Sequence, residues 1–187
     1  MRLFTFFILL FVISFIGNNS NADDISWDEF LDEPKFNVVF LRHALAPGYG
    51  DPPEFNIDNC ETQRNLNDAG QHQARSVGIN IKIKGISFDE IYSSEWCRCI
   101  ETANLMNLGK VITFAGLNSF FEDHYDREET LRKLAIKLEG LEETSRVLMV
   151  THQVVISAIT GINVGSGVAV AYSSRNGLAK KISMQKF

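Results

Sequence analysis

Positive charge is scarce in this sequence. Its 187 residues include 18 lysines and arginines against 23 aspartates and glutamates, which gives a net charge of −5 at pH 7. No basic stripe runs along the chain, so nucleic-acid binding is disfavoured, and the acidic balance also argues against docking on anionic lipid. Internal repeats, low-complexity tracts and a second domain are likewise missing, so the length and composition predict one globular domain.

The sequence also lacks an apolar run long enough to span a membrane. Residues 3–16 are almost wholly apolar, but a membrane-spanning helix needs roughly 20 such residues. Arg2 precedes the run, and small residues stand at Ser20 and Ala22, which is typical of a signal peptide and its cleavage site. We therefore expect cleavage after Ala22, with residues 1–22 as the signal peptide and 23–187 as an exported, periplasmic or secreted domain without a stable membrane anchor. An uncleaved anchor is the alternative.

Cysteine is rare too, with three residues in the chain. In an oxidising compartment two of them can form a disulfide. Cys97 and Cys99 are too close to bridge easily on a helix, so we expect Cys60 to pair with one of them; the alternative is three free, buried thiols. The sequence has no Cys/His spacing typical of metal ligands, so we expect no metal site. We also expect no cofactor. A zinc site would have to use His43, His124 and His152.

Three of the four prolines lie within residues 44–64, together with two glycines. This segment is predicted to be an irregular loop, and long loops in compact domains are usually functional. It begins directly after Arg42 and His43, which follow the apolar run 38–41. Such a run, bounded by loop-forming residues, predicts an interior strand of a parallel sheet.

Three predicted strands carry cationic or imidazole side chains beyond their carboxyl ends. The strands 38–41, 86–92 and 147–150 precede Arg42-His43, Arg98 and His152, respectively. Ligands bind just beyond these ends in open α/β sheets, so we expect the side chains to converge on one site. Arg98 would lie in the first turn of a helix that begins at Glu95 with Ser94 as its N-cap, where backbone N–H groups favour an anion. Alternatively, His43 is a satisfied core histidine and Arg98 a surface residue paired with Glu101.

The remaining elements complete an α/β pattern. They are a short helix from a Ser26–Glu29 capping box to Asp32, a helix with Asn67 as N-cap, a strand at 111–114, an amphipathic helix marked by Leu131, Leu134, Leu138 and Leu141, and a buried helix from His152 through Ile159. The alternating tail predicts an antiparallel edge hairpin with Asn176-Gly177 as a type I′ turn. The order of strands and helices predicts a mostly parallel sheet.

Four motifs follow one another along the chain. They are Arg42-His43-Ala44, Leu66-Asn67-Asp68-Ala69-Gly70-Gln71-His72-Gln73-Ala74, Tyr92-Ser93-Ser94 with Arg98 and Thr102-Ala103, and Val150-Thr151-His152. In this order they resemble the motifs of the histidine phosphatase superfamily, whose fold is phosphoglycerate mutase-like. The match covers nearly all of the predicted mature chain. The resemblance implies a three-layer α/β sandwich with a mostly parallel central sheet.

The resemblance also implies a metal-independent phosphomonoester hydrolase that acts through a phosphohistidine. His43 would attack phosphorus, while Arg42, Arg98 and His152 would hold the phosphoryl oxygens and Arg64 would add a further contact. The exported, short phosphatases of the superfamily are the most similar in shape. We therefore expect a small phosphorylated substrate, such as a sugar phosphate.

The family's proton donor, an acid on the segment after the third strand, falls on Glu122, with Asp123 in reserve. Two positions depart from the family pattern, because Ala44 and Gln153 each replace a glycine. We expect the backbone after His43 to take a different route in consequence. These departures leave open the alternative of an inactive domain that binds a phosphate or phosphosugar.

Overall fold

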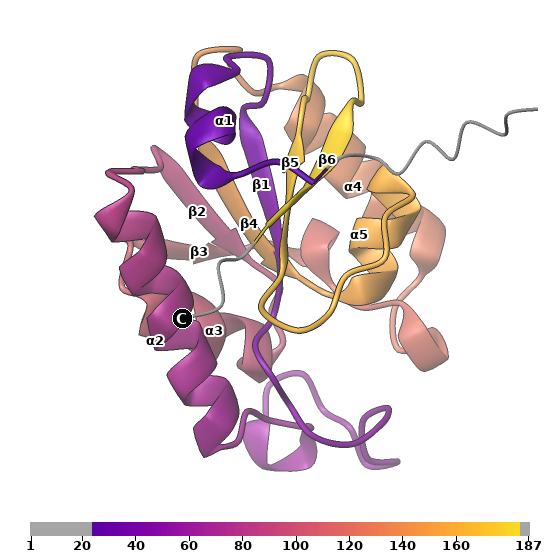
Figure 1. Cartoon of the computed structure of the whole chain (residues 1–187). Coiled ribbons are helices and arrows are strands. Elements are labelled where there is room, and N and C mark those ends of the chain that lie inside the picture. Colours follow the sequence, from indigo (N-terminus) through magenta and orange to yellow (C-terminus); the bar gives the residue numbers. More distant parts are fainter. Residues whose placement is uncertain (1–23, 184–187) are drawn as a thin grey trace, which may run out of the picture.

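The computed structural model describes residues 24–183, so the predicted signal peptide lies outside the described residues. Its centre is a six-stranded sheet with the order β3-β2-β4-β1-β5-β6 (Figure 1). The strands are β1 (Val38–Arg42), β2 (Glu90–Ser93), β3 (Val111–Thr113), β4 (Val147–Thr151), β5 (Ala169–Tyr172) and β6 (Ala179–Ile182). The first four pair in parallel, whereas β5 and β6 run antiparallel at one edge. The predicted mostly parallel sheet with an antiparallel edge hairpin is confirmed.

Helices cover both faces of this sheet (Figure 1). They are α1 (Trp27–Asp32), α2 (Asp68–Ile83), α3 (Cys97–Met106), α4 (Arg127–Glu139) and α5 (Gln153–Thr160). Within residues 24–183, none of them is long and apolar enough to cross a membrane.

Alternation of side chains along β1 divides the core into two halves. Val39 and Leu41 pack in a cluster with residues of α1, α2 and α3, whereas Val38 and Phe40 pack with residues of α4 and α5. All four side chains are fully buried, and each such burial contributes roughly 1.5–3 kcal/mol. The run is therefore apolar throughout because both faces of the sheet are covered, as the predicted three-layer sandwich requires.

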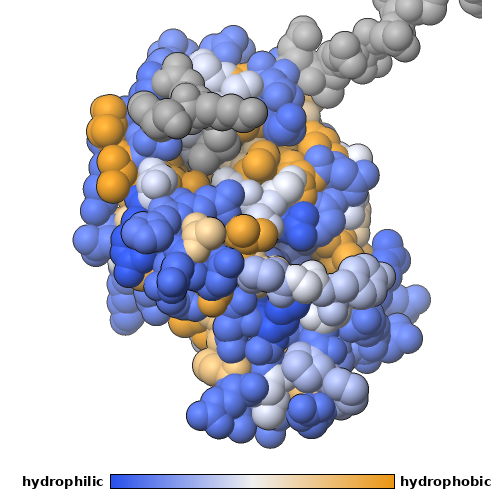
Figure 2. All heavy atoms as spheres, turned by 60° about the horizontal axis from the view of Figure 1, so that its bottom comes forward, coloured by the Kyte–Doolittle hydropathy of each residue, from blue (hydrophilic) through white to orange (hydrophobic). Residues whose placement is uncertain are grey.

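The carboxyl ends of β1, β2 and β4 lie side by side. Arg42 pairs with Thr151 across β1 and β4, and Ser93 pairs with Val150 across β2 and β4. Each ladder is extended by one further hydrogen bond. The His43 N–H donates to the Thr151 carbonyl at 2.9 Å, and the Ser94 N–H donates to the Val150 carbonyl at 2.9 Å. The residues that follow the three strands thus emerge together, at the end of the molecule that Figure 2 brings forward.

Local capping signals fix two of the helix starts as predicted. The Ser26 hydroxyl accepts the Glu29 N–H at 3.1 Å and the Glu29 carboxylate accepts the Ser26 N–H at 2.7 Å, so the capping box of α1 is complete. Asn67 accepts the Gly70 N–H at 2.9 Å and begins α2. A cap of this kind stabilises a helix by about 1 kcal/mol.

The predicted start of α3 is wrong. The helix begins at Cys97 rather than Glu95, and its N-cap residue is Trp96, which makes no side-chain capping bond. The Ser94 hydroxyl accepts only the Trp96 N–H, at 3.3 Å, ahead of the helix, and it also bonds to the side chains of Asn118 and His152. Arg98 nevertheless lies in the first turn, as predicted.

Two further predictions of local structure need correction. The second strand was predicted over 86–92, but β2 begins only at Glu90, because the Ile86 N–H bonds back to Ile81 and closes the end of α2. The hairpin turn is not type I′, which needs positive φ at both central residues. Gly177 has φ +72° but Asn176 does not share the left-handed conformation. Instead, a bond from the Ser173 N–H to the Leu178 carbonyl at 2.9 Å closes a longer loop.

Candidate active site

A cavity of about 360 Å³ lies at the carboxyl ends of β1, β2 and β4. Small-molecule sites usually measure about 300–1,000 Å³. Its lining includes five of the six residues predicted for the site, namely Arg42, His43, Arg64, Arg98 and His152. The sixth, Glu122, does not line it. The convergence expected from the strand ends is therefore what the fold produces.

His43 is 2% exposed and follows β1 directly. Its Nδ1 lies 2.7 Å from the carbonyl oxygen of Ala44. A carbonyl oxygen only accepts, so Nδ1 carries the proton and Nε2 keeps a free lone pair. Burial first, and then the positive charge of Arg98, lowers the pKa of His43 to about 3. The imidazole is therefore neutral at physiological pH, as a nitrogen nucleophile must be.

His152 lies beside His43, with the two ring centroids 5.5 Å apart. Its Nε2 is 2.9 Å from the Ser94 hydroxyl, which donates to Asn118 Oδ1 at 3.1 Å. The Asn118 amide is held in this orientation because its Nδ2 donates to Glu95 at 2.6 Å. Ser94 consequently accepts from Nε2–H and leaves Nδ1 of His152 without the proton. Burial, followed by the charge of Arg98, lowers the pKa of His152 well below its ordinary value.

Arg98 is 3% exposed and pairs with a carboxylate that the sequence did not single out. Its Nη1 and Nη2 donate to the two oxygens of Asp51, at 2.7 and 3.1 Å. Asp51 also accepts the indole N–H of Trp96 at 3.1 Å and the backbone N–H of Arg64 at 3.0 Å. Burial alone would raise the pKa of Asp51, but the hydrogen bonds from Arg98 and Arg64 and the charge of Arg98 together lower it below the ordinary value. A buried, ionised pair results.

Arg64 and Arg42 hold backbone carbonyls around the same cavity. Arg64 Nε donates to Gly50 at 2.7 Å and Nη1 donates to Ala46, so this side chain ties together the loop that follows β1. Arg42 Nη1 donates to the carbonyl of Val164 at 2.9 Å. Among the described residues, the Nε atoms of Arg42 and Arg98 are buried without a hydrogen-bond partner. Such unpartnered donors beside a cationic cavity fit an oxyanion ligand.

Glu122 lies behind the cavity wall rather than in it. Its carboxylate accepts the Asp51 N–H at 3.3 Å and lies 2.5 Å from the point where a Cβ on Gly50 would be. A side chain at Gly50 would therefore collide with it. Glu122 and Asp123 have φ of 59° and 57°, a left-handed conformation that is costly for both residues. The role of either residue as proton donor stays a prediction.

A disulfide joins the loop to α3. Cys60 and Cys97 are bonded, with their Cα atoms 5.7 Å apart, which resolves the predicted alternatives in favour of Cys97. The neighbouring Gln63 accepts the Cys97 N–H at 2.9 Å. The remaining thiol, Cys99, is fully buried, and burial raises its pKa to about 12. It is therefore an unreactive core thiol.

Three residues of the site were missed from the sequence. In the sequence, Asp51 is only part of a predicted loop, Ser94 is a predicted helix cap within a family motif but has no predicted role in the site, and Gln153 is only a departure from a family glycine. The Gln153 side chain accepts the Val164 N–H at 2.9 Å and donates to Asn163, so it holds the segment whose carbonyl receives Arg42. A Gly-Asp-Pro turn inside a long loop was the one available signal for Asp51.

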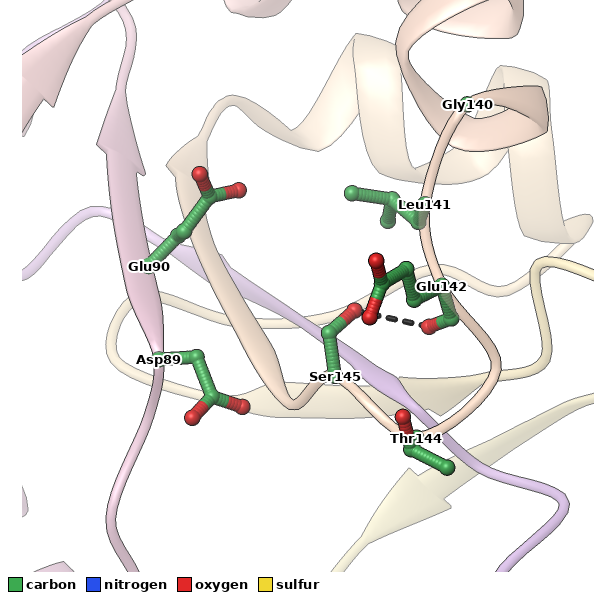
Figure 3. A pocket seen from close by; sticks show the side chains of 7 residues that line it. All are labelled: Asp89, Glu90, Gly140, Leu141, Glu142, Thr144 and Ser145. Atoms are coloured by element: carbon green, nitrogen blue, oxygen red, sulfur yellow. Dashed lines mark hydrogen bonds between the residues drawn. The ribbon is translucent and has the colours of Figure 1, made fainter.

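A second hollow lies at the other end of β2 and β4, at their amino ends, and carboxylates line it (Figure 3). Asp89 accepts the Arg146 N–H at 2.7 Å, and the Ser145 hydroxyl donates to the Glu142 carbonyl at 2.7 Å. None of the predicted site residues lies there. Over residues 24–183, no group of three or more His, Cys, Asp or Glu side chains is arranged to hold a metal ion.

Comparison with known proteins agrees with this geometry. The family model of the histidine phosphatase superfamily (branch 1) matches residues 38–131, half of the chain. No curated protein matches the sequence.

Three solved structures share the fold. One is the protein histidine phosphatase SixA complexed with tungstate (14% identity, 77% of this chain and 92% of that chain covered, TM-score 0.52). Another is phosphoserine phosphatase from Entamoeba histolytica in complex with 3-phosphoglyceric acid (18%, 80% and 96%, 0.55). The third, from Agrobacterium tumefaciens, is provisionally assigned as a phosphohistidine phosphatase SixA (18%, 82% and 99%, 0.56). On the family match, this chain belongs to the histidine phosphatase superfamily, and that membership supports a phosphatase activity.

Proposed function

We propose that this protein is a metal-independent phosphomonoester hydrolase that acts through a phosphohistidine on His43. One observation carries the proposal: a buried, neutral imidazole with its proton fixed on Nδ1 shares a cavity with three arginines and a second imidazole. A dianionic phosphate complements that charge. The free lone pair on Nε2 is the nucleophile that the reaction needs.

The first step forms a bond between His43 Nε2 and phosphorus and breaks the bond from phosphorus to the leaving oxygen. Negative charge on the equatorial oxygens is stabilised by Arg42 and Arg98. His152, whose Nε2–H is bound to Ser94, contributes once the bound dianion raises its pKa and Nδ1 takes up a proton. In the second step water attacks phosphorus, the nitrogen–phosphorus bond breaks, and phosphate leaves. His43 returns to its neutral form with Nδ1–H still on the Ala44 carbonyl.

Glu122 is the proposed proton donor. It would protonate the leaving oxygen in the first step and take a proton from water in the second, so that the protons balance over one turnover. Its carboxylate lies against Gly50, whose backbone lines the cavity. Asp123, the next residue, is the reserve for this role.

The proposed substrate is a small phosphorylated molecule, such as a sugar phosphate, and the proposed location is periplasmic or extracellular. The cavity has room for a phosphate with a small leaving group. Tyr49 and Phe121 stand at its rim, with ring centroids 5.2 Å apart, where they can stack on a ring of the substrate. The Cys60–Cys97 disulfide supports an oxidising location.

The test is phosphate release from p-nitrophenyl phosphate and a panel of sugar phosphates in the presence of EDTA. Wild-type protein is compared with His43→Ala and with His72→Ala, a matched control in which an exposed histidine of α2 is removed. We expect turnover that survives EDTA, is lost in His43→Ala and is retained in His72→Ala. Acid-labile, alkali-stable phosphate on the wild-type protein would identify the intermediate. A folded protein without turnover on any substrate would favour the binding-domain alternative.

A further inference from the structure

The loop after β1 places one ionised carboxylate in the cationic cavity, that of Asp51. It receives four N–H groups: two from Arg98, one from the Trp96 indole and one from the Arg64 backbone, all between 2.7 and 3.1 Å. The side chains of Asp51 and Arg98 are 4% and 3% exposed. Each carboxylate oxygen thus accepts two hydrogen bonds, and the position of the carboxylate is fixed from several sides.

The hydrogen bonds of Arg98 leave one edge of its guanidinium free. A guanidinium has five N–H groups. Two donate to Asp51, and a third, on Nη1, donates to the Arg64 carbonyl at 3.2 Å. The remaining two are Nε–H and the second N–H of Nη2, which are parallel on the same edge. Arg98 Nε is buried without a hydrogen-bond partner among the described residues.

This free edge belongs to a residue that lines the cavity together with His43 and His152. Two parallel N–H groups match two oxygens of a phosphoryl group. We propose that Asp51 is a positioning residue, which holds the outer end of Arg98 so that the Nε–Nη2 edge binds the phosphoryl group. The proposal rests on the proposed function, since it concerns the same phosphate site.

The loop is held firmly enough to act in this way. The Cys60–Cys97 disulfide joins it to the residue next to Arg98, and Arg64 binds the Gly50 carbonyl beside Asp51. A carboxylate so anchored orients Arg98 before the substrate arrives. A different role for Asp51 would be that of a plug, which occupies the Arg98 face that phosphate needs and must withdraw. The two roles predict opposite effects of its removal on phosphate affinity.

The first experiment uses the unaltered protein and inorganic phosphate as the probe. The Nε–H signals of its arginines are recorded by ¹⁵N NMR, and Arg98 is assigned by its loss in Arg98→Lys. We expect the Arg98 Nε–H signal to shift downfield as phosphate binds. Phosphate binding without a shift of this signal would overturn the proposal. The result does not depend on turnover, so a protein that binds phosphate but hydrolyses nothing would refute the proposed function alone.

The second experiment is a double-mutant cycle with Asp51→Asn and Arg98→Lys, read as the inhibition constant of phosphate and as separate kcat and KM values. Lysine keeps the positive charge but lacks the planar guanidinium, so it cannot bind Asp51 with one pair of N–H groups and phosphate with another. We expect Asp51→Asn to weaken phosphate binding by about tenfold or more, the range for a lost hydrogen bond to a charged group. In the Arg98→Lys background, the same substitution should have little further effect on phosphate binding. Asp89→Asn is the matched control, in the hollow at the amino ends of β2 and β4 (Figure 3), where its carboxylate accepts a backbone N–H.

Three results would overturn the proposal: phosphate affinity within twofold of wild type in a folded Asp51→Asn variant, tighter phosphate binding, or full additivity with Arg98→Lys. Tighter binding would identify Asp51 as a plug, and additivity would identify a role that does not pass through Arg98. Removing one partner of a buried ion pair can prevent folding. In that case the NMR titration of the unaltered protein decides.

Discussion

Reduction of the Cys60–Cys97 disulfide should destabilise this domain strongly. The bond closes a loop with a sequence separation of 37 residues. In the chain-entropy treatment, a closed loop of that size lowers the entropy of the unfolded chain enough to stabilise the fold by about 4 kcal/mol at 25 °C. Single domains are stable by only about 5–15 kcal/mol. Reduction should therefore remove a large share of the free energy of unfolding.

Urea denaturation measures the effect directly. The free energy of unfolding is compared for oxidised protein, reduced protein and the variant Cys60→Ser/Cys97→Ser. We expect the midpoint to fall by more than about 1 M urea on reduction, because m-values are about 1–3 kcal/mol/M. The double variant should have the same free energy of unfolding as the reduced protein. Reductant should not change it, because the remaining cysteine, Cys99, forms no disulfide.

Loss of the disulfide should also lower activity in whatever protein stays folded. The loop carries Asp51 and Arg64, and Cys97 precedes Arg98 in the first turn of α3. We expect kcat/KM to fall together with stability. A reduced protein within about 1 kcal/mol of the oxidised one, with unchanged kcat/KM, would refute both the entropic estimate and the positional role of the bond.

The remaining predictions concern titration, proton transfer and packing. The His43 ring signals should not titrate between pH 5 and 8 by NMR, because the pKa of His43 is lowered from 6.5 to about 3 in the folded protein. Below pH 6.5 the unfolded chain binds a proton at His43 that the folded protein does not bind. His43 should therefore lower the free energy of unfolding as the pH drops from 6.5 toward 3. A midpoint near 6.5 would contradict this. Glu122→Gln should slow alkyl phosphates, which are poor leaving groups, more than p-nitrophenyl phosphate; equal losses would move the donor to Asp123 or elsewhere. Gly70→Ala should destabilise the fold by roughly 1–3 kcal/mol, since its Cβ would lie 1.9 Å from the Leu45 carbonyl oxygen, whereas Gly140→Ala, which meets only ordinary contacts, should not.

The sequence identified those parts of the site that local pattern determines. His43, Arg98 and His152 each follow a predicted strand. The carboxyl ends of neighbouring parallel strands lie together regardless of the conformation of the loops that follow them. Asp51 was missed because its partner Arg98 lies 47 residues away and nothing local marks the pair. The Asn176-Gly177 turn was misread for a related reason: the dipeptide allows a type I′ turn, but the register of β5 and β6 requires a longer loop.

The two departures from the family pattern are compatible with catalysis. Gln153 lines the cavity, but its side-chain amide is bound to Asn163 and to the Val164 N–H. What His43 needs from position 44 is a carbonyl to hold Nδ1–H, and alanine supplies it as glycine would. Ala44 is fully buried, does not adopt a left-handed conformation, and donates its N–H to Thr102 at 3.0 Å. Gln153 accepts the backbone N–H of Val164, and the carbonyl of Val164 accepts a hydrogen bond from Arg42. The proposed nucleophile requires a neutral histidine of fixed tautomer, and this site provides one.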